Sequence, residues 1–164
     1  MKKSAFILLA LVFIFGCSSV DKNSEQNISL VEQYIDAVEN LNSEGMDNLL
    51  ANNYIGYGPS HNNEINKEDA IKNWKEISTT LYKSIKYNTS RNIAVTIPDG
   101  ENKGEWVTNW AELTIVYKKD NAQVTIWSNT LYQIEKDKIV KSYTIYNEAD
   151  ALRQLGYEFF NTNE

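Results

Sequence analysis

WVTNWAELTIVY, residues 106–117, is the stretch that decides the fold of this chain. Strand alternation places Val107, Leu113 and Ile115 on one face, and Trp106 and Trp110 on the other. Because both faces carry large apolar side chains, we expect both to be covered. Helices can cover only one of them. The other then meets a second subunit or remains an apolar patch, unless strong curvature and the C-terminal segment cover it within one monomer.

More strands flank this one on both sides. Residues 118–122 turn the chain into a second strand over 124–134, and residues 135–138 turn it into a third over 139–147. Upstream, alternating apolar residues over 93–97 precede a Pro-Asp-Gly turn, in which the glycine supplies a positive φ. The pattern therefore predicts an antiparallel meander that ends in a helical turn over 149–155.

Three helices are predicted ahead of the strands. The first begins at Ser29, whose hydroxyl forms a capping box with Glu32. Its Asp36 and Glu39 lie off the apolar stripe and are expected to be solvated. A short second helix is capped by Ser43, and a third is capped by Asn66, with a strand over 54–59 and a polar loop over 60–65 between them. Helices followed by a meander predict the α+β class, with the helices on one face of the sheet.

The N-terminus has the layout of a secretory signal. Two lysines precede an apolar run over 5–15 that is too short to span a bilayer. The tetrapeptide Ile-Phe-Gly-Cys ending at Cys17 resembles the bacterial lipobox, whose cysteine is acylated and becomes the new N-terminus. We therefore expect a lipoprotein signal peptide over 1–16, a flexible tether over 17–28, and a lipid-anchored, exported protein of the bacterial cell envelope. The alternative is an ordinary signal peptide with an incidental cysteine.

Composition narrows the possible partners. The net charge is −6, and it becomes −8 once the two lysines of residues 1–16 are removed. An acidic chain without a Lys/Arg cluster argues against nucleic acid and against electrostatic attachment to anionic lipid, so the membrane contact is expected through the lipid alone. With a single cysteine the chain cannot form an internal disulfide or a cysteine-based metal site. With a single histidine it also lacks the ligands of a usual histidine-rich zinc site. We expect no metal and no cofactor.

The C-terminal stretch DKIVKSYTIYNEADALRQLG, residues 137–156, resembles the SnoaL-like branch of the nuclear transport factor 2-like (NTF2-like) superfamily. The shared pattern is a charged turn, Lys-Ile-Val, an aromatic residue and a closing Leu-Arg-Gln-Leu-Gly. The resemblance covers about residues 29–158 and leaves 159–164 as a tail. It implies a cone-shaped fold, with N-terminal helices packed on a curved antiparallel sheet around a deep pocket. It also implies a homodimer through the sheet.

Because the resemblance implies a pocket for a small-molecule ligand, we expect aromatic and amide side chains to line it. The candidates are Tyr57, Trp74, Trp106, Asn109, Trp110, Trp127, Tyr143 and Asn147. Each tryptophan taken singly is better explained as a core residue, although we expect at least one of the four to line the pocket. Asn109 needs hydrogen-bond partners if it is buried.

Enzymes of this family use carboxylates or histidine for acid/base chemistry. Where SnoaL-like sequences commonly carry two aspartates, this chain carries Thr144 and Asn147, neither of which is a general base at neutral pH. Glu112 and His61 remain the candidate catalytic residues. Alternatively, Glu112 is a carboxylate that is solvated or paired across strands, and His61 is an exposed loop residue without a catalytic role.

The leading hypothesis is therefore a membrane-anchored lipoprotein whose pocket binds a small apolar or amphipathic ligand, or a protein partner, without catalysis. The alternative is an acid/base enzyme of the isomerase, cyclase or hydrolase type. A purely structural dimerisation module is a third possibility.

Overall fold

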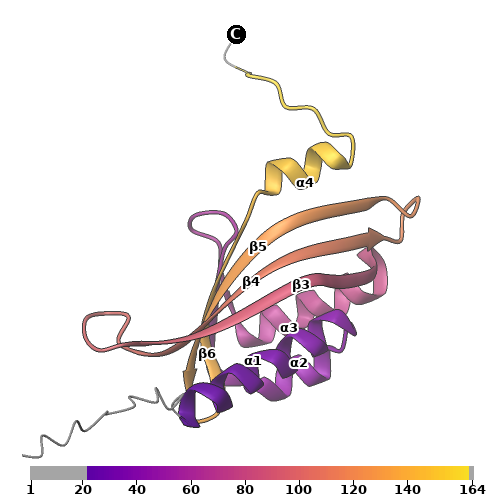
Figure 1. The fold of residues 1–164 in the computed structure, drawn as a ribbon. Coiled ribbons are helices and arrows are strands. Elements are labelled where there is room, and N and C mark those ends of the chain that lie inside the picture. Colours follow the sequence, from indigo (N-terminus) through magenta and orange to yellow (C-terminus); the bar gives the residue numbers. More distant parts are fainter. Residues whose placement is uncertain (1–21, 163–164) are drawn as a thin grey trace, which may run out of the picture.

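The computed structural model describes residues 22–162, which form a strongly curved sheet with helices packed against its concave face (Figure 1). The elements are α1 (Lys22–Glu39), α2 (Ser43–Leu49), β1 (Leu50–Tyr57), β2 (Glu64–Asn66), α3 (Lys67–Glu76), the π-helical turn η1 (Ile77–Leu81), β3 (Tyr82–Ile97), β4 (Gly104–Tyr117), β5 (Gln123–Glu135), β6 (Lys138–Tyr146) and α4 (Glu148–Gln154). The predicted α+β class is confirmed. Among the described residues, no helix is both long and apolar enough to cross a membrane.

The sheet has the strand order β2-β1-β6-β5-β4-β3. The meander from β3 to β6 is antiparallel, as predicted. The prediction of a wholly antiparallel sheet is wrong at one pair, because β1 and β6 run parallel. These two strands are far apart in the sequence, and parallel neighbours require such a long crossover connection. The sheet is therefore mixed, and β2 is a short edge strand within the segment predicted as a loop.

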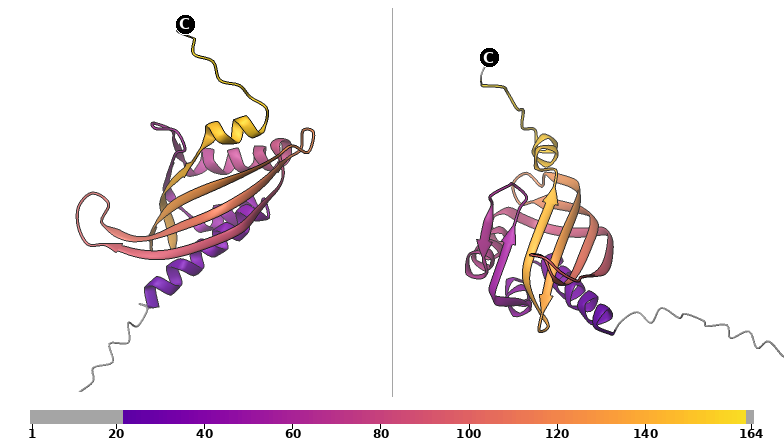
Figure 2. Two further views of the ribbon diagram at one scale, coloured as in Figure 1. Left: turned by 45° about the horizontal axis from the view of Figure 1, so that its top comes forward. Right: turned by 90° about the vertical axis from the view of Figure 1, so that its left-hand side faces the viewer.

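Strand β4 lies inside the sheet and shows the predicted alternation. Val107, Ala111, Leu113 and Ile115 are buried on the concave face, where α1 and α3 pack (Figure 2). On the outer face Trp110 is 61% exposed. The helices thus cover one of the two apolar faces, as the pattern predicted.

The start of α1 differs from the prediction. The helix begins at Lys22, so Ser29 lies inside it and the predicted capping box at Ser29 does not form. Residues 22–28, expected to belong to a flexible tether, are helical instead. The side chain of Asn27 is buried, and Gln26 Nε2 donates to Asp137 Oδ1 in the β5–β6 turn at 2.6 Å. These contacts come from distant parts of the chain, and local periodicity does not reveal them.

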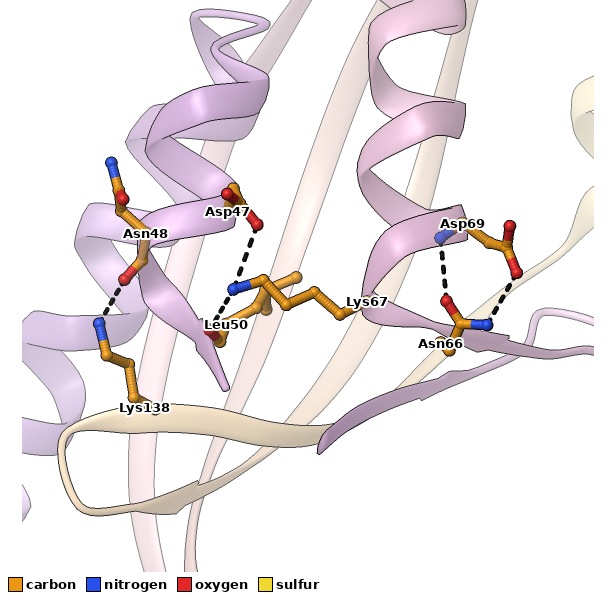
Figure 3. A network of polar contacts seen from close by, with 7 residues as sticks. All are labelled: Asp47, Asn48, Leu50, Asn66, Lys67, Asp69 and Lys138. Carbon is orange, nitrogen blue, oxygen red and sulfur yellow. Dashed lines mark hydrogen bonds and ion pairs between the residues drawn. The ribbon is translucent and has the colours of Figure 1, made fainter. Parts of the chain in front are cut away.

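Polar caps hold α2 and α3 beside β1 (Figure 3). Asn66 caps α3 as predicted, because its Oδ1 accepts from the backbone N–H of Asp69 at 3.0 Å. Lys67 Nζ bridges Asp47 Oδ1 at 3.1 Å and the carbonyl of Leu50 at 2.9 Å. The cap of α2 is Asn42 rather than the predicted Ser43.

Strand β3 is much longer than the predicted segment over 93–97 and begins at Tyr82. Its pairing with β4 shifts register between Tyr87 and Thr89. At this irregularity the backbone N–H of Tyr87 donates to Glu39 Oε1 at 2.9 Å. Glu39 is therefore half-buried rather than solvated, whereas Asp36 is exposed as expected.

Candidate functional site

The concave face, α1, the α3–η1 segment and α4 enclose an inner cavity of about 500 Å³. Its lining is dominated by tyrosines and aliphatic side chains. Eight of the ten tyrosines of the chain take part, namely Tyr34, Tyr54, Tyr57, Tyr82, Tyr87, Tyr117, Tyr132 and Tyr146. This size and the mixture of apolar surface with a few polar groups are typical of small-molecule sites.

One wall of the inner cavity carries hydroxyl groups. Ser128 and Thr130 on β5 lie beside Ser142 and Thr144 on β6, and all four line the cavity. Thr130 Oγ1 donates to Thr144 Oγ1 at 3.3 Å. The hydroxyls of Tyr54 and Ser142 are 2.7 Å apart. The neighbouring part of the sheet is apolar, with Leu113, Ile115, Val124 and Ile126. The cavity therefore offers hydrogen bonds on one side and apolar contact on the other.

Burial keeps the tyrosine hydroxyls protonated. It raises the pKa of Tyr34 and Tyr132 well above the ordinary value of a phenol, and neighbouring tyrosines raise the pKa further. Burial likewise raises the pKa of Tyr54, Tyr82 and Tyr87. At neutral pH these groups are uncharged hydrogen-bonding hydroxyls rather than bases.

These shifts predict a loss of stability at high pH. A tyrosine whose pKa is raised by folding contributes stability that is present below the unfolded value, about 10, and is lost as the pH rises further. We expect the free energy of unfolding to fall above about pH 10, and the buried phenols to ionise together with the loss of circular dichroism. Near-ultraviolet absorbance of phenolate, compared with the urea-unfolded chain, measures this. Ionisation of all ten tyrosines at the unfolded value with the fold intact would contradict it.

Apart from tyrosines, Glu148 is the only ionisable side chain among the described residues that line the inner cavity. It is exposed at the start of α4, where its Oε2 accepts from Ser60 Oγ at 3.3 Å. Glu148 also contributes, after burial, to the raised pKa of Tyr146. Among the described residues, the lining thus consists of hydroxyls, rings, aliphatic groups and the amides of Asn63 and Asn73, with Glu148 as its one carboxylate.

A second hollow of about 870 Å³, the outer groove, lies on the other face of the sheet. The loop over 58–64 and the far end of the β3–β4 hairpin border it. The rings of Tyr57 and Tyr143 stack there at 4.8 Å, and Trp106 stacks on Tyr143 at 6.1 Å. Trp106 Nε1 donates to the carbonyl of Asn102 at 2.8 Å. His61 also lines this groove.

The predicted site residues are thus distributed over both faces of the sheet. Trp74 lines the inner cavity, Trp106, Tyr143 and His61 line the outer groove, and Tyr57 borders both. Trp110 and Trp127 are exposed on the outer face and line neither hollow.

Three further candidates have structural roles. Asn109 is buried, and its Nδ2 donates to Ser90 Oγ and Asn92 Oδ1. Asn147 caps α4 by accepting from the N–H of Asp150 at 3.0 Å. Glu112 lies on the outer face, where its Oε1 accepts from Asn88 Nδ2 at 3.1 Å. It therefore cannot serve as a base in the inner cavity.

The sequence prediction missed most of the tyrosines of the inner cavity, although a signal was available. Alternation along β5 and β6 places Ser128, Thr130 and Tyr132 on the same face as Ser142 and Thr144. This polar face of two adjacent strands was detectable without the structure. Over residues 22–162, no group of three or more His, Cys, Asp or Glu side chains is arranged to hold a metal ion.

No family model matches the sequence, and neither does any curated protein. Solved structures do match the fold. A SnoaL-like polyketide cyclase, so described, from Shewanella putrefaciens CN-32 is 10% identical, with TM-score 0.63 over 81% of this chain and 98% of its own. An NTF2-like protein from Burkholderia xenovorans LB400 is 14% identical, with TM-score 0.61 over 80% and 96%. An LEH-like epoxide hydrolase from M. tuberculosis is 13% identical, with TM-score 0.59 over 81% of this chain and 91% of its own.

These likenesses establish the fold. The chain is an α+β protein with the NTF2-like fold, and the predicted resemblance to SnoaL-like proteins is confirmed at that level. Cyclases and epoxide hydrolase-like proteins are both among its structural neighbours. At identities this low the fold is shared by proteins of many functions, and function must be argued from the site itself.

Proposed function

We propose that this protein is an envelope lipoprotein whose inner cavity binds a small, largely apolar or amphipathic molecule without acid/base catalysis. The lipid on Cys17 anchors it to the membrane. The observation that carries the proposal is the lining of the cavity. Among the described residues, its polar side chains are the hydroxyls of tyrosines, serines and threonines, the amides of Asn63 and Asn73, the indole N–H of Trp74 and the carboxylate of Glu148. A site of this kind orients a ligand by hydrogen bonds but provides no base poised near neutral pH.

An acid/base enzyme is the second candidate, because structural neighbours include a cyclase and an epoxide hydrolase-like protein. Thr144 lines the inner cavity at one position where a family carboxylate is expected, and Asn147 is occupied as a helix cap. Glu148 is the remaining carboxylate, and it is exposed to water. Turnover of a polyketide-like or epoxide substrate, abolished by Glu148→Gln, would favour the enzyme over the binding protein.

A homodimer through the outer face is also part of the proposal. Ile93, Val95, Trp110, Trp127 and Ile145 are exposed large apolar residues of β3–β6, and register places them on this one face, the outer patch. The rings of Trp110 and Trp127 lie 6.3 Å apart. Helices of the same chain pack on the opposite face, so a second copy is the occupant best suited to this patch.

Filling the inner cavity should abolish ligand binding. Leu152 lines the cavity from α4 and is only partly buried, so Leu152→Trp adds volume there at little risk to the fold. We expect the affinity for the neutral fluorescent probe N-phenyl-1-naphthylamine to fall at least about tenfold, roughly 1.4 kcal/mol. Fluorescence titration measures it.

Arg153→Trp is the matched control, because residue 153 is on the same helix but does not line the cavity. It should bind the probe like the unmodified protein. Equal probe affinity in both variants would place binding outside the cavity and contradict the proposal. Native mass spectrometry of the protein purified from its own cells then tests for a retained natural ligand.

A further inference from the structure

The formal charge on the lining of the inner cavity is negative. Over residues 22–162, no lysine, arginine or histidine lines it, and Glu148 supplies the only formal charge of the lining at neutral pH. Glu39 does not line the cavity, but its carboxylate accepts from the backbone N–H of Tyr87, which does. The whole chain is also acidic, with a net charge of −6. An anion entering the cavity would meet no compensating cation, whereas a cation would meet negative potential.

The rings of the inner cavity are also arranged differently from those of the outer groove. Tyr34 and Tyr132 meet edge to face at 5.7 Å, and so do Tyr82 and Tyr117 at 5.1 Å. In an edge-to-face pair the edge of one ring lies against the face of the other, so the contact covers a face of one ring only, whereas a stacked contact covers a face of both rings. In the outer groove Tyr143 stacks on Tyr57 and on Trp106, and these contacts cover faces of all three rings. Uncovered ring faces attract cations through the negative face of the π system.

Together these two observations identify a class of ligand. Resting on the proposed binding function, we propose that the inner cavity selects organic cations that carry a methylated ammonium group, with the cation among the tyrosine rings and Glu148 at the entrance. A quaternary ammonium has no N–H donors, so its burial leaves no hydrogen bond unmade. The hydroxyl wall of Ser128, Thr130, Ser142 and Thr144 accommodates a polar group elsewhere on the same molecule.

Three probes of nearly the same shape distinguish the effect of ligand charge on binding from the effect of ligand size. Choline, 3,3-dimethylbutan-1-ol and 3,3-dimethylbutanoate share a head of three methyl groups and differ in being cationic, neutral and anionic. We expect choline to displace N-phenyl-1-naphthylamine at concentrations at least about tenfold lower than the alcohol, in the range of cation–π energies for desolvated sites. The carboxylate should not displace the probe.

Variants of Tyr146 test the role of the ring. Tyr146 lines the cavity, is half-buried and lies near Glu148. Tyr146→Leu should weaken choline binding about three- to tenfold while leaving the alcohol unchanged, and Tyr146→Phe, which keeps the ring, should bind choline like the unmodified protein. Because Glu148 is exposed, Glu148→Gln should weaken choline binding only a few-fold. Glu158→Gln, in the exposed tail and not lining the cavity, is the charge control.

The outcomes distinguish failure of the cation inference from failure of the proposed binding function. If the fluorescent probe binds and the Leu152→Trp variant abolishes its binding, yet the alcohol competes as well as choline does, the cation inference is overturned and the binding function stands. Competition by the carboxylate would overturn the inference as well. If the fluorescent probe and all three competitors fail to bind the unmodified protein, the binding function fails and the cation inference with it.

Discussion

Replacing Cys17 by serine is expected to move the protein from the membrane fraction to the soluble fraction, or to leave an uncleaved precursor. The apolar run over 5–15 is too short to span a bilayer, so the proposed attachment rests on a lipid carried by the Cys17 thiol. Two or more acyl chains supply stable anchoring, and none can form on a serine hydroxyl at this site. Cell fractionation with immunoblotting, together with the apparent mass of the product, measures the effect.

Ser18→Ala is the matched control, since it changes the neighbouring residue and keeps the thiol. It should fractionate like the unmodified protein. Normal processing and an unchanged membrane fraction in the Cys17→Ser variant would refute the lipoprotein proposal and favour an ordinary signal peptide. The cavity proposal would be unaffected, because the described residues that line the cavity all lie between Tyr34 and Leu155.

Replacing Trp110 by glutamate is expected to split the proposed homodimer. Trp110 is 61% exposed on the outer face, next to Trp127. In a two-fold interface the substitution buries a carboxylate from each copy in an apolar surface, and unpaired buried charges are strongly unfavourable. We expect the dimer dissociation constant to rise at least about a hundredfold, which is roughly 2.7 kcal/mol. Sedimentation of the chain from residue 18 onward, over a wide concentration range, measures this.

Ser29→Glu is the control for the added charge, because Ser29 is exposed on α1, away from the outer patch. It should leave the dissociation constant unchanged. Since Trp110 does not line the inner cavity, probe binding should survive in the Trp110→Glu variant. A stable interface of standard size buries about 800 Å² per partner. A monomer at every concentration would contradict the dimer proposal.

The sequence by itself determined the class of the fold and the strands β4, β5 and β6, whereas β2 and most of β3 were not predicted. Period-two patterns persist through β4, β5 and β6, and this alternation assigned Val107 and Trp110 correctly to opposite faces. Asn66 was recognised as a cap because its amide satisfies a local backbone N–H. The C-terminal motif indicated the NTF2-like fold, which the structural neighbours confirm. All of these signals act over a few residues of chain or in a single contiguous motif.

Only the tertiary structure decided which residues share a cavity. Tyr34, Tyr87 and Tyr132 come from α1, β3 and β5, and the curvature of the sheet brings them together. Trp74, on α3, lines this cavity, whereas the ring of Trp106, on the other face of β4, lies in the outer groove. The helical state of residues 22–28, the half-burial of Glu39 and the parallel pairing of β1 with β6 likewise depend on partners far away in the chain. Local periodicity determines on which face of a strand each side chain lies. Contacts between distant segments determine which helix, strand or cavity lies against that face.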